Sequence, residues 1–132
     1  MKSTAGVALS LLRMIAGGLF LCHGGMKLFG WFGGLPPGAL TPLTLAAGWI
    51  ETVGGSLILL GLFTRAAAFL TAGEMAVAYF KVHFPRGFWP ILNKGEPAVL
   101  FCFIFLLLLA NGAGPISLDR LIALVRKRRA AL

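Results

Sequence analysis

Four apolar segments, each about as long as a lipid bilayer is thick, follow one another along this chain of 132 residues. They run over Ala5–Phe29, Leu43–Phe63, Ala66–His83 and Pro97–Ala113. About 17 to 25 mainly apolar residues in a helix span the hydrocarbon core, where a helix satisfies its own backbone polar groups. The pattern predicts an all-α membrane protein, in which residues 1–114 form a bundle of four transmembrane helices.

A separate helix is predicted at the carboxyl end, in residues 115–132. The sequence NGAGP ends the fourth segment, and Ser117 can cap a new helix. Leu118, Leu121, Ile122 and Val125 then recur at helical spacing, with a basic cluster after them. We expect this basic amphipathic helix to lie on the membrane surface, in contact with anionic lipids.

The charged residues indicate how the chain is oriented. The net charge is +8, but 58% of the residues are hydrophobic and only 12% are charged, so the cations lack the polar face of a nucleic-acid-binding domain. The side with both termini carries seven cations, against four on the other side; the seven are Lys2, Arg65, Arg120, Arg126, Lys127, Arg128 and Arg129. The excess predicts a multi-pass protein of the bacterial inner (cytoplasmic) membrane with both termini cytoplasmic and no nucleic-acid partner.

Five ionisable side chains interrupt the apolar segments: Arg13, His23, Lys27, Glu51 and Glu74. A charge at the centre of a membrane helix costs about 2.5 to 3.5 kcal/mol on insertion scales, so such a residue usually faces a partner or a wet cavity. Counted along ideal helices, His23 and Glu51 share one depth in the outer half, and Arg13 and Glu74 share another in the inner half. We interpret Arg13 and Glu74 as a structural ion pair, and His23, Lys27 and Glu51 as an outer polar set.

The outer polar set suits two roles, which the sequence leaves open. These residues could merely hold the helices in register, or they could bind the polar head of a lipid-soluble molecule or pass protons. In the ligand-binding interpretation, aromatic residues of the outer half form apolar walls. The candidate ligand-binding residues are His23, Lys27, Glu51, Trp49, Phe20, Trp31, His83 and Trp89.

Other site chemistries find less support in the sequence. The histidines and glutamates show none of the HxxxH or ExxH spacings that place two ligands on one element, so no metal site is predicted. Cys22 and Cys102 fall at similar depths, which leaves a disulfide between them open. The chain has no P-loop, nucleotide fingerprint or hydrolase triad, and the sequence identifies no catalytic residue.

Four short motifs occur in order along the chain: HGGMKLFG, GLFTR, VHFPRGFW and GPISLD. With them, the stretch from Arg13 to Asp119 resembles the DoxX family of small bacterial membrane proteins. That family is similar, more remotely, to the small subunit of thiosulfate:quinone oxidoreductases, and some members are linked to thiol and oxidative-stress systems or to quinone detoxification. The motif residues that carry over are His23, Gly24, Lys27, Glu51, Arg65, His83, Gly87 and Trp89.

The resemblance and the outer polar set together favour a redox-associated subunit that binds a quinone-like lipophilic molecule in the outer half of the bundle. Quinone is the one candidate cofactor, and enzymatic activity stays open. One alternative is a non-catalytic structural or partner-binding subunit, whose basic tail recruits a soluble or membrane redox partner. A small transporter is the other. Membrane lipids are expected contacts, and the formation of a homo-oligomer stays open.

Overall fold

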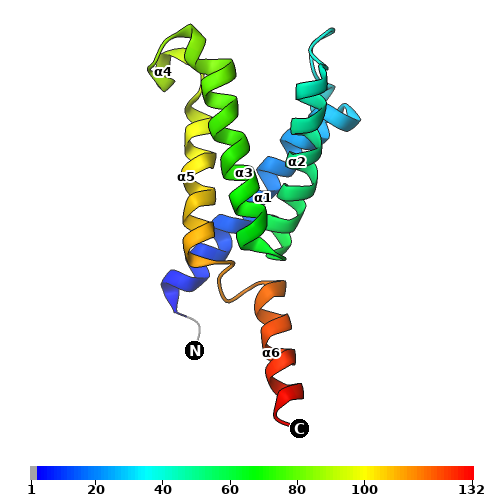
Figure 1. Cartoon of the computed structure of the whole chain (residues 1–132), viewed down its shortest axis with the longest axis vertical. Coiled ribbons are helices and arrows are strands. Elements are labelled where there is room, and N and C mark those ends of the chain that lie inside the picture. The colour runs from blue at the N-terminus through cyan, green and yellow to red at the C-terminus, as the bar shows by residue number, and fades with distance from the viewer. Residues whose placement is uncertain (1–2) are drawn as a thin grey trace.

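The computed structural model describes residues 3–132, and every regular element in that range is helical (Figure 1). The elements are α1 (Thr4–Phe29), η1 (Trp31–Gly33), α2 (Pro42–Leu60), α3 (Thr64–Ala78), η2 (Tyr79–His83), η3 (Phe84–Arg86), α4 (Pro90–Asn93), α5 (Glu96–Asn111) and α6 (Leu118–Ala130). The predicted all-α class is therefore confirmed. Lys2, one of the cations counted for orientation, lies outside the described residues.

Local capping signals set the ends of the first two long helices. The Ser3 side chain accepts a hydrogen bond from the backbone N–H of Gly6, and Thr41 does the same for Thr44. Gly30 and Gly61 end α1 and α2 in the left-handed conformation, with φ of 71° and 68°. An L side chain rarely adopts this conformation, so glycine at these two positions defines the boundaries.

Two of the helices, α1 and α2, are long and apolar enough to cross a membrane, and α5 is a shorter apolar helix. The third predicted segment begins as α3 and continues without interruption through η2, a π-helical turn. All four apolar segments thus form helices close to the predicted bounds.

The long helices associate as two pairs that diverge toward one end of the molecule (Figure 1). In the first pair, α1 and α2 touch backbone to backbone. A Cβ added at Gly17 would lie 2.4 Å from the backbone nitrogen of Leu59, and one at Gly55 would lie 2.6 Å from that of Leu21. Glycine thus allows the backbones of α1 and α2 to approach closely.

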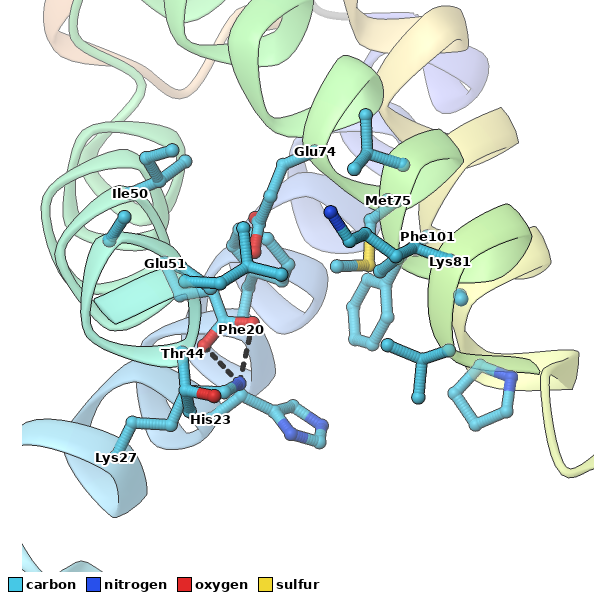
Figure 2. A pocket seen from close by; sticks show the side chains of 18 of the residues that line it. Phe20, His23, Lys27, Thr44, Ile50, Glu51, Glu74, Met75, Lys81 and Phe101 are labelled. Carbon is cyan, nitrogen blue, oxygen red and sulfur yellow. Dashed lines mark hydrogen bonds and ion pairs between the residues drawn. The ribbon is translucent and has the colours of Figure 1, made fainter. Parts of the chain in front are cut away.

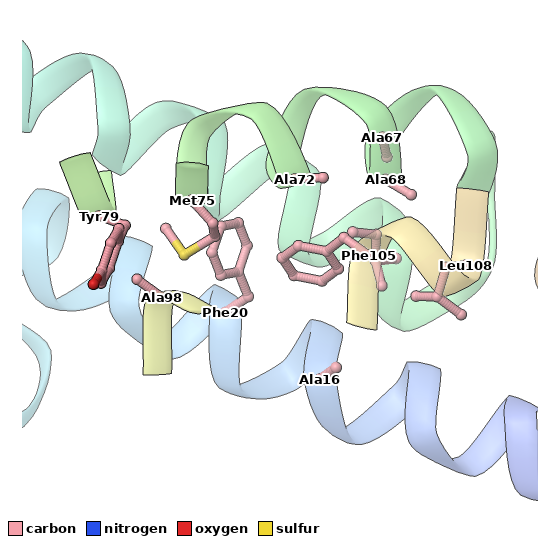
Figure 3. Close-up of a cluster of buried hydrophobic side chains, with 11 residues drawn as sticks. Ala16, Phe20, Ala67, Ala68, Ala72, Met75, Tyr79, Ala98, Phe105 and Leu108 are labelled. Atoms are coloured by element: carbon pink, nitrogen blue, oxygen red, sulfur yellow. The ribbon is translucent and has the colours of Figure 1, made fainter. Parts of the chain in front are cut away.

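The second pair, α3 and α5, packs through small residues facing large ones. Ala68 and Ala72 of α3 leave room for Phe105 and Leu108 of α5, and Phe20 of α1 completes the cluster (Figure 3). The rings of Phe20 and Phe105 meet edge to face with their centroids 4.9 Å apart. This core joins the two pairs over the part of the molecule where they lie close together.

Arg13 of α1 connects several segments at the end of the molecule where the two helix pairs converge. It is only 1% exposed, and its guanidinium donates to four backbone carbonyl oxygens. Nη1 lies 2.7 Å from the oxygen of Ile58 and 2.6 Å from that of Leu59, Nε lies 2.8 Å from that of Ala113, and Nη2 donates to Ile116.

The predicted ion pair between Arg13 and Glu74 is therefore wrong. The last carbonyls of a helix have no intrahelical donor and carry partial negative charge, so the end of α2 offers Arg13 acceptors within reach. Glu74 lies further along the molecule, beside Glu51 (Figure 2).

The segment before and at the start of α6 closes the same end. The Asp119 carboxylate accepts hydrogen bonds from the backbone N–H groups of Phe63 and Thr64, at 2.8 and 3.0 Å, and so caps α3. Ser117 caps α6 as predicted, by accepting from the N–H of Arg120. None of the residues of α6 is buried, and the helix extends away from the bundle instead of lying across its end (Figure 1).

Candidate ligand-binding site

A cavity of about 570 Å³ lies between the two helix pairs, on the side where they diverge. All four long helices line it: Phe20 and Lys27 come from α1, Glu51 from α2, Glu74 and Met75 from α3, and Phe101 from α5 (Figure 2). Most of the lining is apolar, and the polar groups are fewer and mainly ionisable side chains. Small-molecule sites commonly have this composition and a volume of about 300 to 1,000 Å³.

Lys27 and Glu51 form a closed ion pair at one wall of the cavity (Figure 2). The Lys27 ammonium lies 2.7 Å from Oε1 of Glu51 and 2.5 Å from Oε2, so it contacts both carboxylate oxygens. Glu51 is 3% exposed, and Lys27 is half-buried. Because each charge neutralises the other, the pair is tolerated in surroundings that would penalise either group alone.

Glu74 reaches toward this pair from the opposite helix (Figure 2). Its carboxyl group is close enough to that of Glu51 for electrostatic interaction. Its Oε2 atom is buried and has no hydrogen-bond partner among the described residues. The sequence reasoning missed Glu74 as a pocket residue.

A different way of counting would have placed Glu74 correctly. Glu51 lies twelve residues before Phe63 and Glu74 eleven after it, and Phe63 sits in the tight turn between α2 and α3. Residues equally far from the turn of a helical hairpin lie at about the same height. Depth counted from assumed membrane boundaries put Glu74 too near the inner side.

Three of the other expected ligand-binding residues line the cavity. Phe20 packs against Phe101 in the lining, with the two ring centroids 5.5 Å apart. The exposed His23 ring lies nearly perpendicular to the Phe101 ring, with the centroids 6.0 Å apart. His83 lines the cavity as well, with Nδ1 3.1 Å from the carbonyl oxygen of Asn93. Since a carbonyl only accepts, Nδ1 donates the hydrogen in this bond.

The three tryptophans expected as walls lie outside the cavity lining. Trp49 is 55% exposed, because it lies two positions before Glu51 and therefore points about 200° away from it around α2. Trp31 packs over Gly25 on α1, and Trp89 is 64% exposed. Phenylalanine and methionine take the expected place of tryptophan.

Within residues 3–132, no group of three or more histidine, cysteine, aspartate or glutamate side chains is placed to hold a metal ion. Cys22 and Cys102 are free thiols. The disulfide left open by the sequence is thus not formed in this structure.

Residues 8–84 match the DoxX family. The chain belongs to the DoxX family. The matched range contains most of α1 and all of α2 and α3, and with them Lys27, Glu51 and Glu74 of the cavity. DoxX proteins are membrane-associated, in agreement with the length and apolarity of α1 and α2.

A relative of this DoxX protein occurs in Haemophilus influenzae. That protein, described as uncharacterized, is 44% identical over 122 residues, which cover 84% of this chain and 87% of the relative. No solved structure matches the chain.

Proposed function

We propose that this DoxX protein crosses the bacterial inner membrane four times, binds a quinone-like lipophilic molecule between its two helix pairs, and acts as a redox-associated subunit. The observation that carries the proposal is the cavity itself. It combines aromatic walls with a buried ion pair and a further buried carboxyl group. A quinone-like molecule, in its oxidised or its reduced form, fits this composition, since its flat apolar ring bears only a few polar oxygens.

Helix lengths support four spans. The 15-residue α3 and the five-residue η2 form one continuous stretch of about 30 Å, which equals the thickness of a typical hydrocarbon core. The 16-residue α5 reaches about 24 Å, and α4 lies directly before it. Large apolar side chains are exposed on several long helices, among them Ile15, Phe69 and Phe103. Lipid would cover such a surface, whereas water would not favour it.

The charge pattern supports cytoplasmic termini. α6 carries Arg126, Lys127, Arg128 and Arg129 in its last turns, and all four are exposed. The end of the bundle joined to α6 would therefore face the cytoplasm, and the divergent end with its cavity would occupy the outer half of the membrane.

The cavity is placed for access from lipid. Ile50 of α2 and Leu70 and Val77 of α3 line it and are also exposed, by 39%, 64% and 55%. The gap between α2 and α3 would thus open sideways into the hydrocarbon core. A lipophilic ligand dissolved in the membrane would enter by this route without crossing water.

Mass spectrometry of solvent extracts from purified protein tests this function. We expect about one quinone per chain, or restored binding after a quinone is added back. Ala47→Phe fills the cavity from α2 and should lower quinone content at least tenfold, whereas Trp49→Phe, two residues away and outside the lining, should leave it unchanged. Equal quinone content in these two variants would exclude this site, and absence of binding after reloading would refute the function.

One observation favours a second candidate, a non-catalytic subunit that recruits a partner. α6 has no buried residue, and Leu121, Leu124 and Val125 are exposed beside the basic cluster. Deleting residues 121–132 leaves Asp119 in place to cap α3. If partner recruitment is the function, this deletion should abolish co-purification of a redox enzyme while quinone content stays constant.

A further inference from the structure

The carboxyl oxygens of Glu51 and Glu74 in the cavity differ in whether a hydrogen-bond donor already contacts them. Both oxygens of Glu51 are held by the Lys27 ammonium, at 2.7 and 2.5 Å. Each Glu51 oxygen thus already has a donor, and a ligand donor would satisfy no unpaired atom there. Oε2 of Glu74 is buried, and no donor contacts it among residues 3–132.

Oε2 of Glu74 can accept a hydrogen bond in either protonation state of the carboxyl group. If the group is ionised, both of its oxygens only accept hydrogen bonds. If it carries a proton, it has one O–H donor and keeps acceptor capacity at its oxygens. In both states a donor on a ligand could pair with Oε2.

We propose that Oε2 of Glu74 recognises a hydrogen-bond donor on the ligand, so that the cavity selects hydroxyl-bearing aromatic lipophiles, such as phenols and hydroquinones, over counterparts that only accept. This inference rests on the proposed function, because it specifies the ligand class of the same site. A buried acceptor without a donor is unfavourable, and a ligand hydroxyl removes that cost, whereas an ether or carbonyl oxygen does not.

The surroundings of Glu74 fit an aromatic alcohol. Met75 follows it on α3 and is 7% exposed, and Phe20 and Phe101 contribute two aromatic rings to the same lining (Figure 2). A ligand ring would pack against these apolar groups while its hydroxyl contacts Glu74. An alkyl tail would extend past the exposed Leu70 toward lipid.

A matched pair of ligands tests the inference on the full chain purified in detergent. 4-Hexylphenol and 4-hexylanisole have nearly the same shape, but methylation removes the donor from the second. We expect isothermal titration to show about tenfold tighter binding of the phenol, a ratio that corresponds to 1.4 kcal/mol. Glu74→Leu should bind both compounds equally. Glu74→Gln, which keeps an acceptor oxygen, should retain the preference.

Control variants and alternative outcomes separate the two proposals. Glu96→Gln changes an exposed carboxyl group outside the cavity lining and should preserve the tenfold ratio. Equal affinities of the wild type for both compounds, or a preference that survives in Glu74→Leu, would overturn the role of Glu74 and leave a lipophile-binding cavity standing. If neither compound nor a quinone bound the wild type, the proposed function itself would fail.

Discussion

Replacing Arg13 with methionine should be among the most destabilising single changes at the convergent end of the bundle. The side chain is 1% exposed and donates four hydrogen bonds to carbonyl oxygens of α2 and of the segment between α5 and α6. Such bonds contribute about 0.6 kcal/mol each in membrane bundles and about 1 kcal/mol in soluble proteins. For four bonds, the free energy of unfolding is expected to fall by about 2.4 to 4 kcal/mol. Methionine occupies part of the vacated volume, which limits the cavity contribution.

Equilibrium unfolding by sodium dodecyl sulfate, followed by circular dichroism in mixed micelles, measures this loss. Arg86→Met is the matched control, because Arg86 is exposed on η3 at the other end, and it should change stability by less than about 0.5 kcal/mol. A loss below about 1 kcal/mol in Arg13→Met would refute the reasoning. Arg13→Met and Glu74→Gln should also be additive, and a coupling energy above about 1 kcal/mol would instead support an ion pair between these residues.

Substitutions at three further contacts can be measured by the same unfolding experiment. Gly17→Ala should lower the free energy of unfolding by more than about 2 kcal/mol, because the new Cβ would lie 2.4 Å from the backbone of α2. Gly73→Ala, which has open space around it, should raise this free energy by up to about 1 kcal/mol. Equal effects of the two substitutions would contradict the close contact between α1 and α2. Lys27→Met should lower the free energy of unfolding by about 3 to 5 kcal/mol, because it leaves the buried Glu51 carboxylate unpaired. Adding Glu51→Leu should restore most of that stability, and a double variant no more stable than Lys27→Met would contradict this explanation. Asp119→Asn should cost about 1 kcal/mol by weakening the cap on α3, and an unchanged midpoint would argue against that cap.

The helices of this fold are predictable because their signals are local. Apolar length, the capping Ser117 and the glycines that end α1 and α2 each act within a few residues of their position. The contacts that hold the helix pairs together at one end are not local. Arg13 binds carbonyls 45 to 103 residues away, and no side-chain pattern in the sequence marks a backbone oxygen as its partner.

The candidate site was predictable in part for the same reason. A count along ideal helices puts Glu51 at the depth of His23, one turn before Lys27, and so groups these three residues. The structure pairs Lys27 with Glu51. Trp49 was misplaced because the count considered its depth but not its rotation around α2. Glu74 was misplaced because its depth was taken from an assumed membrane boundary, although the turn between α2 and α3 supplies a more reliable reference.

The position of the cavity follows from where the two helix pairs are fastened. Glycine contacts hold α1 against α2, and the cluster around Phe105 joins α3 and α5 to α1. Arg13 and Asp119 then lock the end near α6, since each bonds backbone groups of segments distant in sequence. At the divergent end the pairs separate, and the cavity opens there. The angle between the pairs, and with it the width of the cavity, therefore depends on residues that contact no ligand.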